Sequence, residues 1–222
     1  MCLTGCNKPA PPTSGSGATP AGCATTPCPS KDVLTEDQAK ALFDELKNQP
    51  QIPFDYPVDC CYTRANEMCR IMESKGTACR KYWLFDEKWG EGGMKASLAP
   101  VKGGKPVDFP DPDTGRREPV RWVYHVAPLV RVKKADGSVD EMVMDPSIAD
   151  GPVTKDQWRK IQGDSPGLYE EYSDSKAYFK NDNKGYREED PTGDKTKTQL
   201  EKHKKSRDKA LKREQDLKKS SP

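Results

Sequence analysis

A chain of 222 residues with 33% hydrophobic and 32% charged residues has room for one domain of ordinary size. The sequence contains no nucleic-acid-binding motif and no apolar stretch long enough to cross a bilayer, which excludes these two classes of protein. The net charge is only +2, but the mean hydropathy of −0.95 is low, and the polar residues concentrate at the two ends. We therefore expect one globular domain, at 31–179, between polar extensions.

Residues 1–30 are predicted to form a flexible tether, because 18 of these 30 residues are Pro, Gly, Ser or Thr. Near its start, Leu3-Thr4-Gly5-Cys6 resembles the lipobox of bacterial lipoproteins, whose cysteine receives a lipid anchor. Only Met1 and Cys2 precede this motif. Two alternatives stay open: the sequence starts inside a longer signal peptide, or the match at Cys6 is accidental.

Two amphipathic helices are predicted next. Thr35 followed by Gln38 is a capping-box pattern, and the apolar residues after it share one face, so a first helix should run from about 36 to 48, before Pro50. A second apolar stripe is closed by Gly76 and consists of Cys61, Ala65, Met68, Cys69 and Met72.

Cys61 is therefore expected in the first turn of a helix, and Cys60 about 100° around the axis from it. The free N–H groups at a helix N-terminus stabilise a thiolate and supply a donor for an oxyanion. The alternative interpretation is that Cys61 is a small buried apolar residue.

The other cysteines do not indicate a metal site. No C-x-x-C pair occurs, and His125 and His203 are the only histidines. If the protein is exported, candidate disulfides are Cys23 with Cys28 and Cys69 with Cys79.

Residues 120–145 are typical of a β-hairpin with its turn at 136–137. His125 lies in the first strand and Asp145 ends the second. A tight turn centred on 136–137 pairs residues whose numbers add up to 273. In this register Asp145 lies opposite Pro128, and its side chain is on the other face of the hairpin from His125. One bulge, expected at Pro128 because proline donates no ladder hydrogen bond, changes the sum to 272 and brings the two side chains to one face.

His125 is either a satisfied strand histidine or a catalytic base, and a Cys-His pair would have to use it because His203 lies in the polar C-terminal segment. The aromatic residues nearby, Trp83, Trp122 and Tyr124, are expected to be core residues rather than pocket residues. Strand alternation predicts that Trp122 and Tyr124 point away from the face of His125.

The rest of the chain is predicted to hold a short helix and a charged tail. Thr154 with Gln157 repeats the capping box, so we expect a short helix packed through Trp158 and Ile161. Residues 180–222 carry 14 Lys and Arg against nine Asp and Glu, which predicts a Lys-rich tail, helical or disordered. The tail is either solubilising or a weak contact for an anionic surface.

A set of motifs in the middle of the chain resembles the bacterial protein-glutaminase family. In order, these motifs are DCCYTRANEM, KYWLF, MKAS, W-V-YHVAPLV at 122–130, MDPSI at 144–148 and GPVTKDQW at 151–158. The resemblance implies an α+β fold of the papain-like and transglutaminase-like kind, in which a helix bearing the cysteine packs on an antiparallel sheet bearing histidine and aspartate.

Carried over residue by residue, the resemblance makes Cys61 the nucleophile, His125 its base and Asp145 the residue that orients the histidine. The chain departs from the family at Cys60, where relatives usually have glycine, which leaves open a vicinal disulfide or a change in backbone freedom. It also has Asn66 in place of a histidine and an extended insertion at 86–119.

The implied reaction is deamidation of protein glutamine side chains through a thioester, with release of ammonia and without a cofactor. The same triad also suits a transglutaminase or a cysteine protease. A fourth alternative is a catalytically silent, tethered binding protein with Cys60 and Cys61 locked together. The expected partners are proteins or peptides with accessible glutamine, without nucleic acid. The expected location is secreted or cell-envelope, or else the protein is an effector delivered into another cell.

Overall fold

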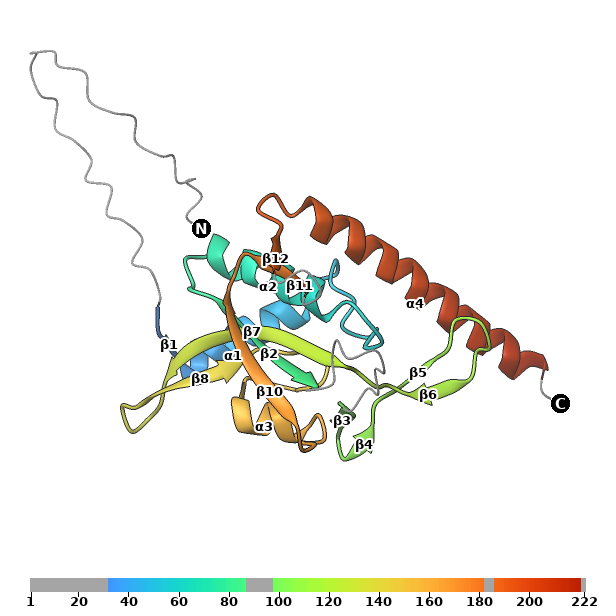
Figure 1. Cartoon of the computed structure of the whole chain (residues 1–222), viewed down its shortest axis with the longest axis horizontal. Helices are drawn as coiled ribbons and strands as arrows, with labels where there is room; N and C mark the ends of the chain where they lie inside the picture. Colours follow the sequence, from blue (N-terminus) through green and yellow to red (C-terminus); the bar gives the residue numbers. More distant parts are fainter. Residues whose placement is uncertain (1–31, 87–97, 182–185, 221–222) are drawn as a thin grey trace, which may run out of the picture.

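The computed structural model describes residues 32–86, 98–181 and 186–220, and shows helices on both faces of an antiparallel sheet (Figure 1). The predicted α+β class is confirmed. The helices are α1 (Glu36–Lys47), α2 (Cys61–Ser74), α3 (Lys155–Lys160) and α4 (Asp194–Ser220).

The main sheet has six strands, with β7 in the middle. The strand order is β10-β2-β7-β8-β9, all antiparallel, and the short β1 adds to β7 in parallel. The strands are β1 (Leu34–Thr35), β2 (Arg80–Asp86), β7 (Tyr124–Lys133), β8 (Val139–Val143), β9 (Val153–Thr154) and β10 (Leu168–Asp174).

Three two-stranded sheets surround this core. Two of them, β3–β4 and β5–β6, lie within the segment 86–119 that the sequence marked as an insertion. The pairs are β3 (Val101–Lys102) with β4 (Lys105–Pro106), β5 (Asp108–Pro110) with β6 (Arg117–Pro119), and β11 (Ala177–Asn181) with β12 (Tyr186–Glu189).

Side chains alternate along β7, so each face of the sheet has its own cluster of buried residues. On one face, Val130 and Val132 pack with the buried sides of α1 and α2. On the other face, Ala127 and Leu129 pack with Trp158 of α3. Covering both faces explains why the residues of β7 from 125 to 130 are all buried.

The predicted starts of α1 and α3 are confirmed. Both helices begin with a capping box in which a threonine side chain accepts the backbone N–H three residues later: Thr35 from Gln38, and Thr154 from Gln157, each at 3.2 Å. The second helix is also confirmed: α2 begins at Cys61, its predicted stripe is buried, and Gly76 follows it with φ +74°.

The hairpin has the predicted register but not the predicted bulge. Leu129 pairs with Val143 and Lys133 with Val139, so the paired numbers sum to 272 along the whole ladder. The extra residue therefore lies in the turn, where Gly137 has φ +88°, and not at Pro128. Gly137 adopts this left-handed conformation without steric cost, which makes the turn the cheapest place for the shift.

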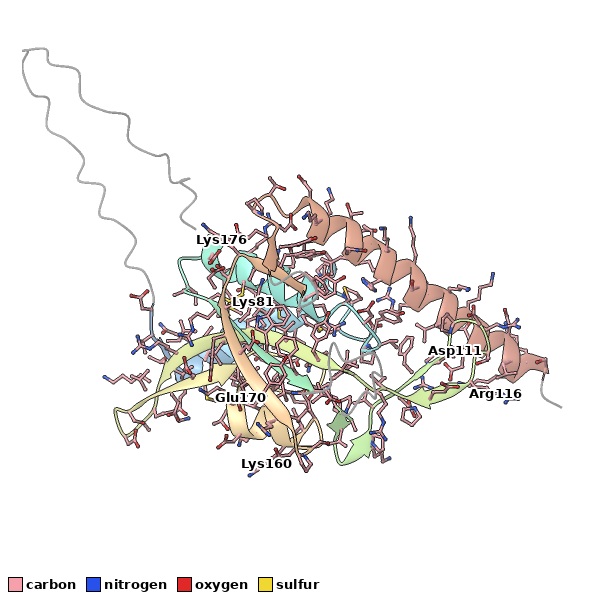
Figure 2. The ribbon with its side chains drawn as sticks, in the orientation of Figure 1. Lys81, Asp111, Arg116, Lys160, Glu170 and Lys176 are labelled. Carbon is pink, nitrogen blue, oxygen red and sulfur yellow. A yellow bond between two sulfur atoms is a disulfide. The ribbon has the colours of Figure 1, made fainter. Side chains whose placement is uncertain are left out.

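The charged C-terminal segment is helical and packs on the domain. α4 runs along one side of the molecule from the β11–β12 pair to the β5–β6 pair (Figure 1). Its Leu200 and Ala210 are 3% and 0% exposed, and Arg207 pairs with Asp55 at 3.0 Å. Figure 2 shows Asp111 and Arg116 at the tip of the β5–β6 hairpin, beside the C-terminal part of α4.

A buried polar network holds the start of α4 against α2. The fully buried Lys81 of β2 lies in the interior (Figure 2) and donates to the side chain of Asn66 at 2.7 Å and to the carbonyl of Ala177. Asn66 donates to the hydroxyl of Thr196 at 2.8 Å. Burial lowers the pKa of Lys81 to about 7. The Asn66 departure from the family pattern is thus part of the contact between these two helices.

One predicted disulfide is formed: Cys69, in the second half of α2, is joined to Cys79, the residue before β2. The predicted tether, the lipid-anchor cysteine Cys6 and the pair Cys23 and Cys28 lie outside the described residues. Of the helices in the described ranges, none combines the length and apolar character needed to span a membrane.

The docking of α4 predicts a stability difference between two leucines of the same helix. Leu200→Ala removes a side chain that is 3% exposed and should lower the free energy of unfolding by about 2 to 4 kcal/mol. Leu217→Ala is the matched control, because Leu217 is 36% exposed, and should cost less than about 1 kcal/mol. Urea unfolding followed by circular dichroism measures both. Equal losses would contradict the packing of α4.

Candidate active site

Cys61 is the first residue of α2, and its thiol lies at the positive end of the helix. Its side chain is mostly buried, with 8% exposure, and packs with Ala65, Trp83 and Val126. Burial raises the pKa of the Cys61 thiol to about 12, since a thiolate is poorly solvated there. A thiolate at this position therefore needs a proton acceptor and positive charge close by.

Cys60 occupies a backbone conformation that favours glycine. Its φ is +80°, in the left-handed region, and its side chain is fully buried. The family preference for glycine at this position thus has a backbone cause, as one of the two alternatives predicted. Cys60 and Cys61 are both free thiols, so the vicinal disulfide is absent from this structure.

His125 and Asp145 are brought together by the hairpin register. Asp145 follows β8 at the place where the ladder would set it opposite Ala127, diagonal to His125. The Nε2 atom of His125 lies 2.8 Å from Oδ2 of Asp145, and both side chains are almost fully buried. The sequence prediction that these two residues share a face is confirmed.

Asp145 is saturated with hydrogen-bond donors. Its Oδ2 also accepts from the indole Nε1 of Trp158 at 2.9 Å, and its Oδ1 accepts from the hydroxyl and the backbone N–H of Ser147. Burial by itself raises the pKa of Asp145, but His125 and the donors from Ser147 and Trp158 outweigh it and hold the pKa well below its ordinary value. Asp145 is therefore an anion at neutral pH.

The Asp145 carboxylate fixes the tautomer of His125. A carboxylate only accepts hydrogen bonds, so Nε2 carries the proton and Nδ1 of the neutral ring has the free lone pair. Nδ1 is buried and has no hydrogen-bond partner among the described residues. Burial lowers the pKa of His125, against the opposing effect of Asp145, so the ring is neutral and able to accept a proton at Nδ1.

Cys61 and His125 both lie beside an open edge of β7. β8 pairs with β7 only from Leu129 onward, so the β7 backbone next to His125 is uncovered on that side. Cys61 packs with Val126, the residue that follows His125. The helix that carries the thiol and the strand that carries the imidazole thus meet one residue away from His125.

A cavity of about 330 Å³ opens at Cys61. The segment before α2 and the segment before β7 form its walls, and its lining includes Pro57, Val58, Asp59, Cys61, Trp122 and Tyr124. The cavity combines aromatic surface with polar groups at its edge, as binding sites for small ligands usually do.

Sequence reasoning misplaced Trp122. The strand begins only at Tyr124, so alternation does not reach Trp122, which is held by an isolated bridge to Leu98. Its ring stacks on His125 with centroids 4.0 Å apart and 9° between planes, and its Nε1 donates to the carbonyl of Pro57 at 2.9 Å. The prediction that Trp122 points away from His125 was wrong, because it assumed a strand two residues too long.

Two residues that hold Asp145 were also missed as site residues. Trp158 was expected only to pack, and it does pack on His125 with centroids 5.3 Å apart, but its indole N–H also reaches Asp145. Ser147 lies in the MDPSI motif, two residues after Asp145, where a serine typically bonds back to a preceding aspartate. That spacing was the one signal in the sequence that could have identified it.

The site contains no arrangement suited to a metal ion. Across residues 32–86, 98–181 and 186–220, no group of three or more His, Cys, Asp or Glu side chains converges.

Solved structures of protein-glutaminases share this fold. A crystal structure of protein-glutaminase has a TM-score of 0.58 and 26% identity, over 77% of this chain and 88% of the other. The NMR structure of protein-glutaminase from Chryseobacterium proteolyticum has a TM-score of 0.59 and 25% identity, over 78% and 89%. A crystal structure of pro-protein-glutaminase, 24% identical over 82% and 62%, has the same fold with a TM-score of 0.60.

These likenesses define an α+β enzyme with the protein-glutaminase fold. A family model described as glutaminase matches residues 39–162, more than half of the chain, and the chain belongs to this glutaminase family. It is accordingly an enzyme that acts on glutamine side-chain amides. No curated protein is a significant match.

The donors to Asp145 predict a pH-dependent stability contribution from Trp158. Trp158→Phe removes an N–H bonded to a buried carboxylate and should lower the free energy of unfolding at pH 7 by about 1.5 to 3 kcal/mol. Because the folded-state pKa of Asp145 is depressed, this contribution is present above the unfolded pKa of about 4 and is lost as pH falls through the folded value. Urea unfolding at pH 7 and at pH 1 measures the difference.

Trp83→Phe is the control for this experiment. Trp83 is also fully buried, but its Nε1 donates to the neutral hydroxyl of Ser173 at 2.8 Å. Its replacement should cost the same at both pH values. A Trp158→Phe cost that does not shrink in acid would show that the indole contributes by packing alone.

The backbone of Cys60 predicts that glycine is tolerated there and a β-branched residue is not. Cys60→Gly loses a small buried side chain but relieves the left-handed conformation, so the free energy of unfolding should change by less than about 1 kcal/mol. Cys60→Val should lower it by about 2 kcal/mol or more. Thermal unfolding compares the two variants, and a glycine variant less stable than the valine variant would refute the backbone explanation.

Proposed function

We propose that the protein deamidates glutamine side chains of intact proteins, with Cys61 as nucleophile, His125 as base and Asp145 as the residue that orients His125. The observation that carries this proposal is the state of His125: Nε2 is bonded to Asp145, while Nδ1 is buried and has no partner in the described part of the chain. An imidazole held in this way is prepared to take a proton from a group that approaches Nδ1. The family membership supplies the amide substrate.

The reaction proceeds in two steps. Nδ1 of His125 takes the proton of the Cys61 thiol, and the sulfur attacks the side-chain carbonyl carbon of glutamine. The C–N bond then breaks, His125 gives its proton to the leaving nitrogen, and ammonia departs from a thioester. Nδ1 of His125 then takes a proton from water, and the oxygen of this water attacks the thioester carbon. The C–S bond breaks, glutamate is released, and His125 returns the proton to the sulfur of Cys61.

The start of α2 supports the negative charge that forms on the way. The backbone N–H of Cys61 points out of the helix N-terminus and is the proposed donor to the oxyanion, with the helix dipole adding to the effect. Asp145 stabilises the imidazolium that exists between the two proton transfers, and its own donors keep it ionised throughout.

The cavity beside Cys61 is the proposed glutamine slot. Trp122 and Tyr124 offer aromatic surface to the methylene groups of the side chain, and Asp59 lies at the mouth, where it is exposed to solvent. Since the glutamine belongs to a protein, its backbone has to remain outside.

We further propose that the enzyme works outside the reducing cytoplasm. The Cys69–Cys79 disulfide supports this location, because such bonds persist in oxidising compartments. The predicted lipid anchor at Cys6 and the alternative of delivery into another cell stay predictions.

The test is ammonia release from casein by the purified chain, with intact-mass analysis of the casein in the same tube. Ammonia accompanied by a mass gain of about one unit per site is expected. Cys61→Ala should abolish both signals, and Cys60→Gly, the neighbouring cysteine variant, should retain them. Casein fragments would indicate a protease and crosslinked casein a transglutaminase. Full activity in Cys61→Ala would refute the proposed nucleophile.

A further inference from the structure

Arg64 is a buried arginine one turn beyond Cys61 on α2. Residues three apart on a helix are neighbours on its surface, so the two side chains leave α2 on the same side. The arginine is only 2% exposed. Arginine is rarely buried to this extent without a carboxylate partner, because a charge removed from water has to be compensated.

The partners of Arg64 are carbonyl groups. Its Nη1 donates to the backbone oxygens of Tyr56, at 2.8 Å, and Asp59, at 2.7 Å, both in the segment that leads into α2. Its Nη2 is buried and has no hydrogen-bond partner among the described residues. Within the described chain no carboxylate forms an ion pair with Arg64. The carbonyls satisfy part of the guanidinium but leave its charge uncompensated.

The nearby anion does not cancel this charge. Asp59 is exposed, and its carboxylate accepts the backbone N–H of Cys60 at 2.6 Å. Water screens an exposed charge, whereas Arg64 acts through the protein interior. Among the charges that act on the Cys61 thiol, Arg64 has the largest effect and lowers its pKa, while Asp59 raises it by less. Arg64 also lowers the pKa of the Cys60 thiol, the Tyr56 phenol and the His203 imidazole. Among these groups and Cys61, Cys61 is the one that lines the cavity in the described part of the chain.

We propose that Arg64 is the counter-cation of the Cys61 thiolate, a positioning residue whose uncompensated charge favours the ionised nucleophile while its two carbonyl bonds fix the segment 56–59 beside the cavity. This role rests on the proposed function of Cys61.

The charge of Arg64 also acts on the proton carried by His125. Arg64 lowers the pKa of His125, in addition to the larger effect of burial. When the thiol proton moves to Nδ1, the sulfur becomes anionic and is stabilised by Arg64, while the imidazolium becomes a stronger acid. The stronger acid gives its proton more readily to the departing ammonia. One buried cation thus assists both the attack of the sulfur and the loss of nitrogen.

The experiment measures the pH dependence of iodoacetamide alkylation at Cys61, located by peptide mass mapping, which requires no substrate. Arg64→Gln keeps a hydrogen-bond donor but removes the charge, and should move the midpoint upward by about one pH unit, which is about a tenfold loss of thiolate. Arg64→Lys keeps the charge and should retain the wild-type midpoint. Arg70→Gln is the matched control on the exposed side of α2, where Arg70 pairs with Glu67 at 3.1 Å, and should leave the midpoint unchanged.

Ammonia release from casein is measured with the same variants. At pH 7, kcat should fall about tenfold in Arg64→Gln, recover as the pH rises, and be rescued in Arg64→Lys. An unchanged alkylation midpoint in folded Arg64→Gln would overturn the proposal. Midpoints that rise equally in Arg64→Gln and Arg64→Lys would also overturn it, because they would mean that Arg64 only holds the segment 56–59. If Arg64→Gln does not fold, Arg64→Lys decides alone: a wild-type midpoint supports the role, and a raised one refutes it. If the alkylation midpoints of the wild type and the variants are as expected but the wild type releases no ammonia, deamidation is refuted, while the role of Arg64 as counter-cation of the Cys61 thiolate is still supported.

Discussion

The buried carboxylate of Asp145 is the constraint on which the rest of the site depends. An anion that is 3% exposed is stable only when donors surround it, and here they come from three places in the chain: the imidazole on β7, the hydroxyl and N–H of Ser147, and the indole of α3. The register of the hairpin places His125 beside Asp145, and the capping box begins the helix α3 that carries Trp158. Once they are in place, the orientation of His125 follows, because only one of its nitrogens remains free.

The reacting groups are then arranged around the edge of one strand. α2 lies on one face of the sheet and the imidazole belongs to the other, and the two meet where β8 stops pairing with β7. In the proposed mechanism, the thiol at the start of α2 meets the histidine at this edge of the sheet. It also explains why the strand has to be left uncovered beside His125, although its neighbours are paired for most of their length.

Local patterns were enough to predict the helices α1, α2 and α3 and the β7–β8 hairpin, whereas the proposed triad came from the resemblance to the family. The capping boxes, the apolar stripe of α2 and the pairing register of the hairpin depend on residues close together in sequence, and the structure agrees with each of them. The bulge expected at Pro128 was a local error, because the extra residue lies in the turn at Gly137. The other errors concern contacts between distant segments. The stacking of Trp122 on His125 requires knowing where β7 begins, and the bond from Trp158 to Asp145 requires knowing where α3 docks. The packing of α4 was hidden for the same reason, because its few apolar residues are outnumbered by lysines whose partners, such as Asp113, lie about a hundred residues earlier.

The position of α4 has a consequence for the order in which the enzyme is made. His203 and Arg207 of this helix contact Tyr56 and Asp55, in the segment that shapes the cavity and receives the bonds of Arg64. Since α4 is translated after every other described element, this segment acquires its outer contacts only when synthesis has passed residue 207. The sheet and the paired His125 and Asp145 are therefore synthesised before the helix that braces the wall of the proposed glutamine slot.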